Sequence, residues 1–153
     1  MKYCLDANFF ITTWRYYSPE IVEGEGYGNW LTKLVIDKEI FIPTEVYEEI
    51  EVGGDDLYYW LKNIKNEIVV PMDDKTQEIV VQIMNNKPEA RSFADSNKKD
   101  NADIFVVASA KRNNSTVVTN DTKLRNLCKS CDVKCLKDCE FLKERKLKMS
   151  ISK

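Results

Sequence analysis

Short apolar runs recur along the chain and predict five buried strands. They lie at residues 2–6, 39–42, 68–70, 116–119 and 133–136. Runs of this length, bounded by turn residues, are typical of strands that are covered on both faces. The second and third runs are each followed by a proline, which ends the extended segment.

Helical spacing of apolar residues fills the intervals between these strands. Trp30, Leu31 and Leu34 share one helical face, and Asn29 is expected to cap that helix. Residues 102–110 are apolar nearly all round, which predicts a central buried helix. The other helices are expected to begin at the following capping residues: Thr44, Asp55 or Asp56, Asp74, Asp121 and Asp138.

Strands that alternate with helices predict an α/β fold, a three-layer α/β/α sandwich with a mainly parallel five-stranded sheet. We expect one domain over residues 1–146 and a basic, disordered tail over 147–153. The polar stretch 86–101 is long for a plain connection, so we expect it to face a substrate.

Composition removes several classes of function. The chain has 153 residues, a net charge of −2 and no histidine. The missing histidine excludes Ser/His/Asp catalysis, Cys/His catalysis and histidine-bound zinc. With this charge, a polyanion would be held only by local basic patches or through a bound cation.

The sequence predicts a cytoplasmic protein. Asp6 and Asn8 interrupt the first apolar stretch, which therefore does not read as a signal peptide. No run approaches the roughly 18 apolar residues that a membrane span needs, so no membrane partner is expected. We expect the five cysteines to be reduced.

Four acidic residues occupy positions that a parallel fold brings together: Asp6, Glu49, Asp103 and Asp121. The carboxyl ends of strands beside a topological switch point face the ligand crevice. Carboxylates gathered there repel one another unless a hard cation lies between them. The pattern therefore predicts metal-assisted chemistry on a phosphate ester.

Each acid also has a plainer interpretation. Asp6, Asp103 and Asp121 could stabilise helix N-termini, where acidic residues are favoured. Glu49 could be a solvated surface charge. It lies beside the apolar stripe of its helix, whereas Glu48 points to the opposite side, so Glu49 is preferred for the site.

Several segments, taken in order, resemble PIN-domain proteins. They are Tyr-Cys-Leu-Asp-Ala-Asn at 3–8, Pro-Thr-Glu-Val-Tyr-Glu-Glu-Ile at 43–50, Asn-Ala-Asp-Ile-Phe-Val-Val-Ala-Ser-Ala at 101–110 and Val-Val-Thr-Asn-Asp at 117–121. Trp14-Arg15-Tyr16-Tyr17 and the stretch from Gly54 to Trp60 resemble a small bacterial and archaeal branch of that family. The likeness covers nearly the whole chain.

The resemblance implies a Mg²⁺- or Mn²⁺-dependent ribonuclease, often the toxin of a type II toxin–antitoxin pair. Expected partners are an RNA substrate, an antitoxin protein and a second copy of the chain. The resemblance makes the four acids the metal-binding and catalytic residues. It gives Asn8 and Thr119 supporting roles, and the long loop before Asp103 leaves Asp100 as a rival or helper acid.

Basic residues near the expected site are candidates for RNA phosphate contacts. Their alternative is ordinary surface charge. The candidates are Lys98, Lys99, Lys111, Arg112, Lys123 and Arg125.

Three other functions stay open. The compressed spacing of Cys128, Cys131, Cys135 and Cys139 allows a zinc site, although Cys128 and Cys131 share an apolar stripe and are expected to be buried thiols. An aspartyl-nucleophile phosphatase would need a second Asp where this chain has Asn8. An inactive PIN-like module that binds RNA or a protein is the third.

Overall fold

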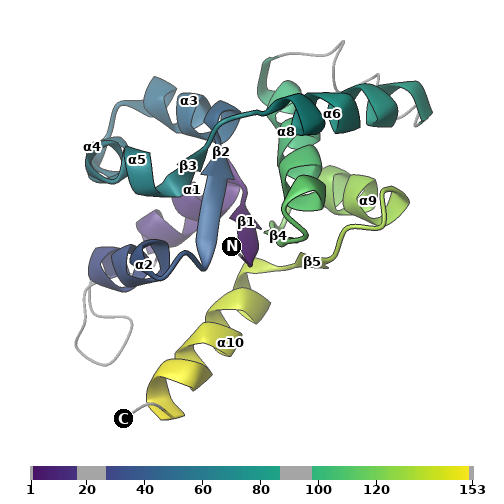
Figure 1. Cartoon of the computed structure of the whole chain (residues 1–153). Helices are drawn as coiled ribbons and strands as arrows, with labels where there is room; N and C mark the ends of the chain where they lie inside the picture. The colour runs from purple at the N-terminus through teal and green to yellow at the C-terminus, as the bar shows by residue number, and fades with distance from the viewer. Residues whose placement is uncertain (1, 17–26, 87–97, 152–153) are drawn as a thin grey trace.

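The computed structural model describes residues 2–16, 27–86 and 98–151, with side chains over the shorter ranges 2–14, 30–86 and 102–144. It is an α/β fold around a single five-stranded sheet, as the sequence predicted (Figure 1). The strands are β1 (Tyr3–Leu5), β2 (Ile40–Pro43), β3 (Val69–Val70), β4 (Thr116–Val118) and β5 (Cys135–Leu136).

All strand pairs are parallel, and the strand order is β3-β2-β1-β4-β5. Tyr3 pairs with Ile40 on one side and with Thr116 on the other. The chain adds β2 and β3 on one side of β1, then returns to add β4 and β5 on the other. The switch point therefore lies at β1 and β4, and ligand crevices form at the carboxyl ends of such strands.

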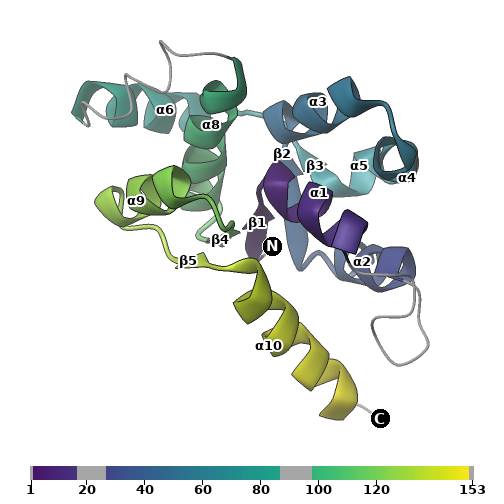
Figure 2. The ribbon, with the colours of Figure 1, turned by 180° about the vertical axis from the view of Figure 1, so that it is seen from behind.

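Helices fill every connection between the strands. They are α1 (Ala7–Tyr16), α2 (Tyr27–Ile36), α3 (Thr44–Gly53), α4 (Asp56–Asn63), α5 (Lys65–Ile68), α6 (Asp74–Asn86), α8 (Lys98–Arg112), α9 (Thr122–Ser130) and α10 (Asp138–Ile151). In both views, α2 to α5 lie on the β2–β3 side and α6, α8 and α9 on the β4–β5 side, while α10 projects away (Figures 1 and 2).

Three predicted capping residues, Asn29, Thr44 and Asp74, lie inside the first turn of their helices and not before it. Asn29 lies inside the first turn of α2, because that helix begins at Tyr27. Pro43, without a side-chain hydrogen bond, is the N-cap of α3 in place of Thr44. Asp73, one residue before the expected Asp74, accepts hydrogen bonds from the Thr76 amide and hydroxyl, both at 2.7 Å.

The central helix α8 begins earlier than expected. Helix α8 starts at Lys98, so the polar stretch 86–101 ends inside this helix; residues 87–97 lie outside the described part.

Two helices were not predicted. The apolar run that follows Asp6 forms α1, and Ile68, which was expected to begin the third strand, is the last residue of α5. The last helix continues to Ile151, through part of the expected tail.

One hydrophobic core joins the sheet to the helices. Phe9, Trp30, Phe41 and Val107 are among its fully buried members. The first turn of α10 enters the core through Phe141, whose ring lies 5.0 Å from that of Tyr3 and 5.4 Å from that of Phe9. Within the described residues, no helix combines the length and apolarity needed to cross a bilayer.

Candidate active site

Asp6 is a buried carboxylate at the carboxyl end of β1. Its side chain is 3% exposed, and the hydroxyl of Thr119 donates a 2.7 Å hydrogen bond to its Oδ2. Burial is the main cause that raises the pKa of Asp6 to about 6. The hydrogen bond from Thr119 lowers this pKa, whereas the nearby charge of Asp121 raises it. The backbone N–H groups of Ala7 and Asn8 also bind this carboxylate. Asp6 therefore stabilises the start of α1 as well as facing other acids.

Thr119 links Asp6 to Asp121 across the switch point. Its hydroxyl donates to Asp6 and accepts a 3.1 Å hydrogen bond from the backbone N–H of Asp121. Asp121 is the N-cap of α9, and its Oδ1 accepts from the Leu124 amide at 3.1 Å. One hydroxyl thus fixes the relative position of two strand-end acids. We call Asp6, Thr119, Asp121 and the nearby Asp138 the carboxyl-edge site.

Asp138 belongs to this site, although the sequence reasoning treated it only as a helix start. It follows β5 by two residues and is 5% exposed. Burial raises its pKa to about 6, and the charge of Asp6 adds to that rise. A signal was available in the sequence, because Asp138 follows β5 closely, much as Asp121 lies three residues beyond β4 (Thr116–Val118).

Asp103 reaches the same edge on α8. The Cys4 thiol donates to the Val106 carbonyl oxygen at 3.8 Å, and Asp103 lies almost one helical turn before Val106. The end of α8 leads into the start of β4, so its beginning points to the carboxyl edge. Asp103 itself is 9% exposed. Its place near the start of α8 therefore puts Asp103 on the carboxyl-edge side of the sheet.

Glu49 lies on α3, which follows β2. It is half-buried and its neighbour Glu48 is exposed, which agrees with the choice between them made from helical geometry. Val46 and Ile50 are buried on the same helix. Of the supporting residues, Asn8 is exposed in the first turn of α1. Asp100 lies in the first turn of α8, and its side chain is outside the described ranges.

The candidate RNA-contacting residues do not all lie beside the acids. Lys111 and Arg112 are in the last turn of α8, at the amino edge of the sheet. Lys111 donates to the Cys131 carbonyl at 3.0 Å, and Arg112 pairs with Asp73 at 3.1 Å. We therefore remove both from the proposed RNA surface.

Lys123 and Arg125 both follow Asp121 on α9, but they differ in exposure. Lys123 is exposed in the first turn. Arg125 is half-buried, and its Nη1 is covered with no hydrogen-bond partner among the described residues. Lys98 and Lys99 begin α8, with side chains outside the described ranges. Lys123, Lys98 and Lys99 thus stay as candidates on the carboxyl edge.

The cysteines do not gather into a metal site. Cys128 and Cys131 are buried as expected, whereas Cys139 is exposed. The Cys128 and Cys135 thiols interact, which raises the pKa of Cys128 and lowers that of Cys135. Within the described ranges, no three His, Cys, Asp or Glu side chains are already arranged around a common metal position.

The carboxyl-edge site nevertheless has donors suited to Mg²⁺ or Mn²⁺. All are hard oxygen ligands, and the buried Oδ1 of Asp138 has no hydrogen-bond partner among the described residues. Mg²⁺ commonly binds one or two protein carboxylates and keeps several waters. Asp6 and Asp121 could provide these carboxylates. The described residues therefore have the right ligand chemistry for such an ion, although they do not surround a complete coordination site.

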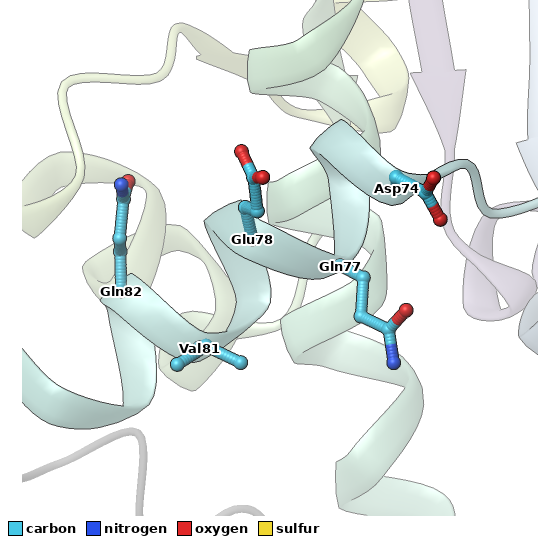
Figure 3. A pocket seen from close by; sticks show the side chains of 5 residues that line it. All are labelled: Asp74, Gln77, Glu78, Val81 and Gln82. Carbon is cyan, nitrogen blue, oxygen red and sulfur yellow. The ribbon is translucent and has the colours of Figure 1, made fainter.

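A surface hollow lies on another part of the molecule. It has a volume of about 540 Å³ and is lined by Asp74, Gln77, Glu78, Val81 and Gln82. Figure 3 shows that all five side chains come from α6, with Glu78 and Gln82 on one side of the helix and Gln77 and Val81 on the other. No member of the carboxyl-edge site lines this hollow.

The parallel five-stranded sheet and the helices that cover it form a PIN-like fold. The model of one family, described as "Domain of unknown function (DUF4411)", matches residues 3–149. The chain belongs to this family. Comparison with curated proteins gives no match.

Solved structures share the fold at low sequence identity. VapBC-1 from nontypeable Haemophilus influenzae is 14% identical with a TM-score of 0.58, over 91% of this chain and 99% of that one. VapBC2 from Rickettsia felis, bound to a DNA fragment from its promoter, is 18% identical with a TM-score of 0.58, over 90% and 98%. FitAcB from Neisseria gonorrhoeae is 18% identical with a TM-score of 0.54, over 89% and 97%.

Proposed function

We propose that this protein is a Mg²⁺- or Mn²⁺-dependent ribonuclease. The observation that supports this most is the buried Asp6 carboxylate at the switch point, which other acids repel. A buried charge without a cationic partner is costly, and a divalent ion would remove that cost. Such an ion, when bound, makes hydroxide available near neutral pH and offsets charge that develops on the phosphate.

The residues of the site would divide the remaining work. Asp6, Asp103 and Asp121 would hold the ion. Thr119 would fix the position of Asp6 relative to Asp121 through its two hydrogen bonds. Glu49 orients the attacking water or completes a second ion site. The lysines on the carboxyl edge, Lys123 with Lys98 and Lys99, contact phosphates outside the acidic pocket.

Cleavage of single-stranded RNA tests this function. With Mg²⁺ or Mn²⁺, we expect cleavage that Asp6→Asn and Asp103→Asn each reduce on the order of 100-fold. Asp74→Asn is the matched control, because Asp74 is an exposed acid that begins α6 and is outside the carboxyl-edge site. Metal-dependent cleavage that survives Asp6→Asn would contradict the assignment.

A non-catalytic module is the second candidate. It is favoured by the absence, in the described part of the chain, of three metal-binding side chains already arranged together. Calorimetry with Mn²⁺ separates the two, because the nuclease must bind the ion and an inactive module need not. A phosphatase that uses Asp6 as nucleophile would instead yield a trapped aspartyl-phosphate.

An antitoxin protein is the proposed partner, and the chain is proposed to be the toxin of the pair. Support comes from the VapBC and FitAB structures that share its fold. Expression of the chain alone should slow cell growth, and co-expression of a neighbouring small gene product should restore it. A homodimer is also proposed, and light scattering would measure it.

A further inference from the structure

Asp138 has a buried carboxylate oxygen without a hydrogen-bond partner in the described part of the chain. The residue is 5% exposed, and its Oδ1 is covered by protein without a hydrogen bond among the described residues. Its other oxygen, Oδ2, accepts from the Asn120 side-chain amide at 2.9 Å. Buried polar atoms are nearly always paired, so an unpaired carboxylate oxygen is available to bind a ligand.

Helix capping does not explain why this carboxylate is present. Asp138 is the first residue of α10, but its own N–H donates to Oδ1 of Asn120 at 2.9 Å. The preceding N–H, from Lys137, donates to the Glu140 side chain at 2.9 Å. Other side chains therefore satisfy these two amide groups at the start of α10, and the Asp138 carboxylate is turned instead toward Asn120.

Asn120 holds Asp138 toward the acids of the site. Asn120 lies between Thr119, which binds Asp6, and Asp121, so its two hydrogen bonds join the β4–α9 connection to the start of α10. Asp6 and Asp138 are close enough for Asp6 to raise the pKa of Asp138. Two buried carboxylates that repel each other are stabilised by a cation.

We propose that Asp138 is a further carboxylate of the metal site, with its Oδ1 helping to hold the divalent ion and Asn120 positioning it. This inference rests on the proposed function, since it requires an ion at Asp6. It adds β5 and α10 to the elements that build the site.

Binding of Mn²⁺ alone, measured by calorimetry, tests the inference without an activity assay. We expect Asp138→Asn to weaken Mn²⁺ binding about 10- to 100-fold. Asp138→Glu, which keeps a carboxylate, should bind more tightly than Asp138→Asn. The Asp74→Asn control should bind as the unsubstituted protein does. The rise in melting temperature on adding Mn²⁺ should shrink in parallel with affinity.

The outcomes separate this inference from the function on which it rests. If Asp138→Asn binds Mn²⁺ normally while Asp6→Asn does not, the role of Asp138 is overturned and the metal site stands. If the unsubstituted protein binds no Mn²⁺, both fail. If Asp138→Asn does not fold, Asn120→Ala decides: weaker Mn²⁺ binding supports the positioning of Asp138, and unchanged binding overturns it.

Discussion

Burial gives the residues of the carboxyl-edge site their unusual electrostatics. Asp6 and Asp138 are each more than nine-tenths buried, and each has a pKa raised to about 6. The folded, metal-free protein therefore binds these protons more tightly than the unfolded chain does. Such groups stabilise the folded state at low pH and lose that contribution as the pH rises through the folded pKa.

We predict that Asp6 and Asp138 make the metal-free protein less stable as the pH rises from about 4 to about 7. For Asp6, a rise from 3.8 to about 6 corresponds to about 3 kcal/mol at neutral pH. Urea unfolding across this range in the presence of a chelator measures the change. Asp6→Asn and Asp138→Asn should each flatten the pH dependence, and an unchanged slope in both would contradict this account.

Residue identities at the site could be inferred only in part from the sequence. Asp6 and Asp121 follow apolar runs, so strand geometry indicated them. Asp138 follows its run in the same way, but a helix start was a sufficient explanation until the structure showed Asn120 and Glu140 binding amide groups there. Hydrogen bonds between residues 18 apart in sequence, as for Asn120 and Asp138, leave no local pattern.

At the scale of elements, helix ends depend on single residues. Helix α3 ends at Gly53, and Gly54 follows with φ of 57°, in the left-handed region. The next helix begins at once, because Asp55 caps α4 by accepting from the Tyr58 amide. The sequence predicted the start of α4 at Asp55 or Asp56, and a Gly-Gly pair before an Asp is typical of one helix ending where another begins.

Adjacent glycines provide a matched test of this turn. We predict that Gly54→Ala destabilises the protein by about 1 kcal/mol, because a residue with a Cβ is strained at positive φ. Gly53→Ala should be neutral or slightly stabilising, since Gly53 ends α3 without a positive φ. Neither added Cβ meets an atom within 4 Å. Equal unfolding free energies for the two variants would be inconsistent with this reasoning.

Helix α10 joins the core through one aromatic residue. We predict that Phe141→Ala costs about 3–5 kcal/mol of stability, because Phe141 is fully buried and contacts Tyr3, Phe9 and Trp30. Leu142→Ala, at a half-buried neighbouring position, should cost less. Denaturant unfolding compares the two variants, and a smaller loss for Phe141→Ala than for Leu142→Ala would show that α10 is anchored elsewhere.

Short elements were the hardest to predict. Helix α5 has four residues and includes Ile68, an apolar residue that fits a strand equally well. Pro43 is the N-cap of α3, because a proline is tolerated where no amide partner is needed, so Thr44 is the first residue of the helix and not its cap. Tertiary packing decides such boundaries, so a local pattern cannot.

At the scale of the whole molecule, the order of strands and helices was predictable because parallel strands require helical crossovers. The strand order was not, since it depends on contacts between segments far apart in the chain. Residues 3–5 pair with segments from both halves of the sequence. The central place of β1 is what brings Asp6 near Asp121 and Asp138 from later segments.

A single core predicts a single unfolding transition. The described core spans all five strands, and Trp30 and Phe141 join its early and late segments. Tryptophan fluorescence, which reports on Trp14, Trp30 and Trp60, should therefore change at the same denaturant concentration as far-ultraviolet circular dichroism. Two separate midpoints would instead indicate two independently folding units within residues 1–146.

The outer strands of the sheet, β3 and β5, are only two residues long. A rim this short presents few open backbone groups, so another polypeptide has almost no template along which to add a strand. Self-association by extending the sheet is therefore disfavoured, and amyloid-like stacking of native molecules has no obvious starting point. Any stable assembly of this protein should be built through its helical surfaces.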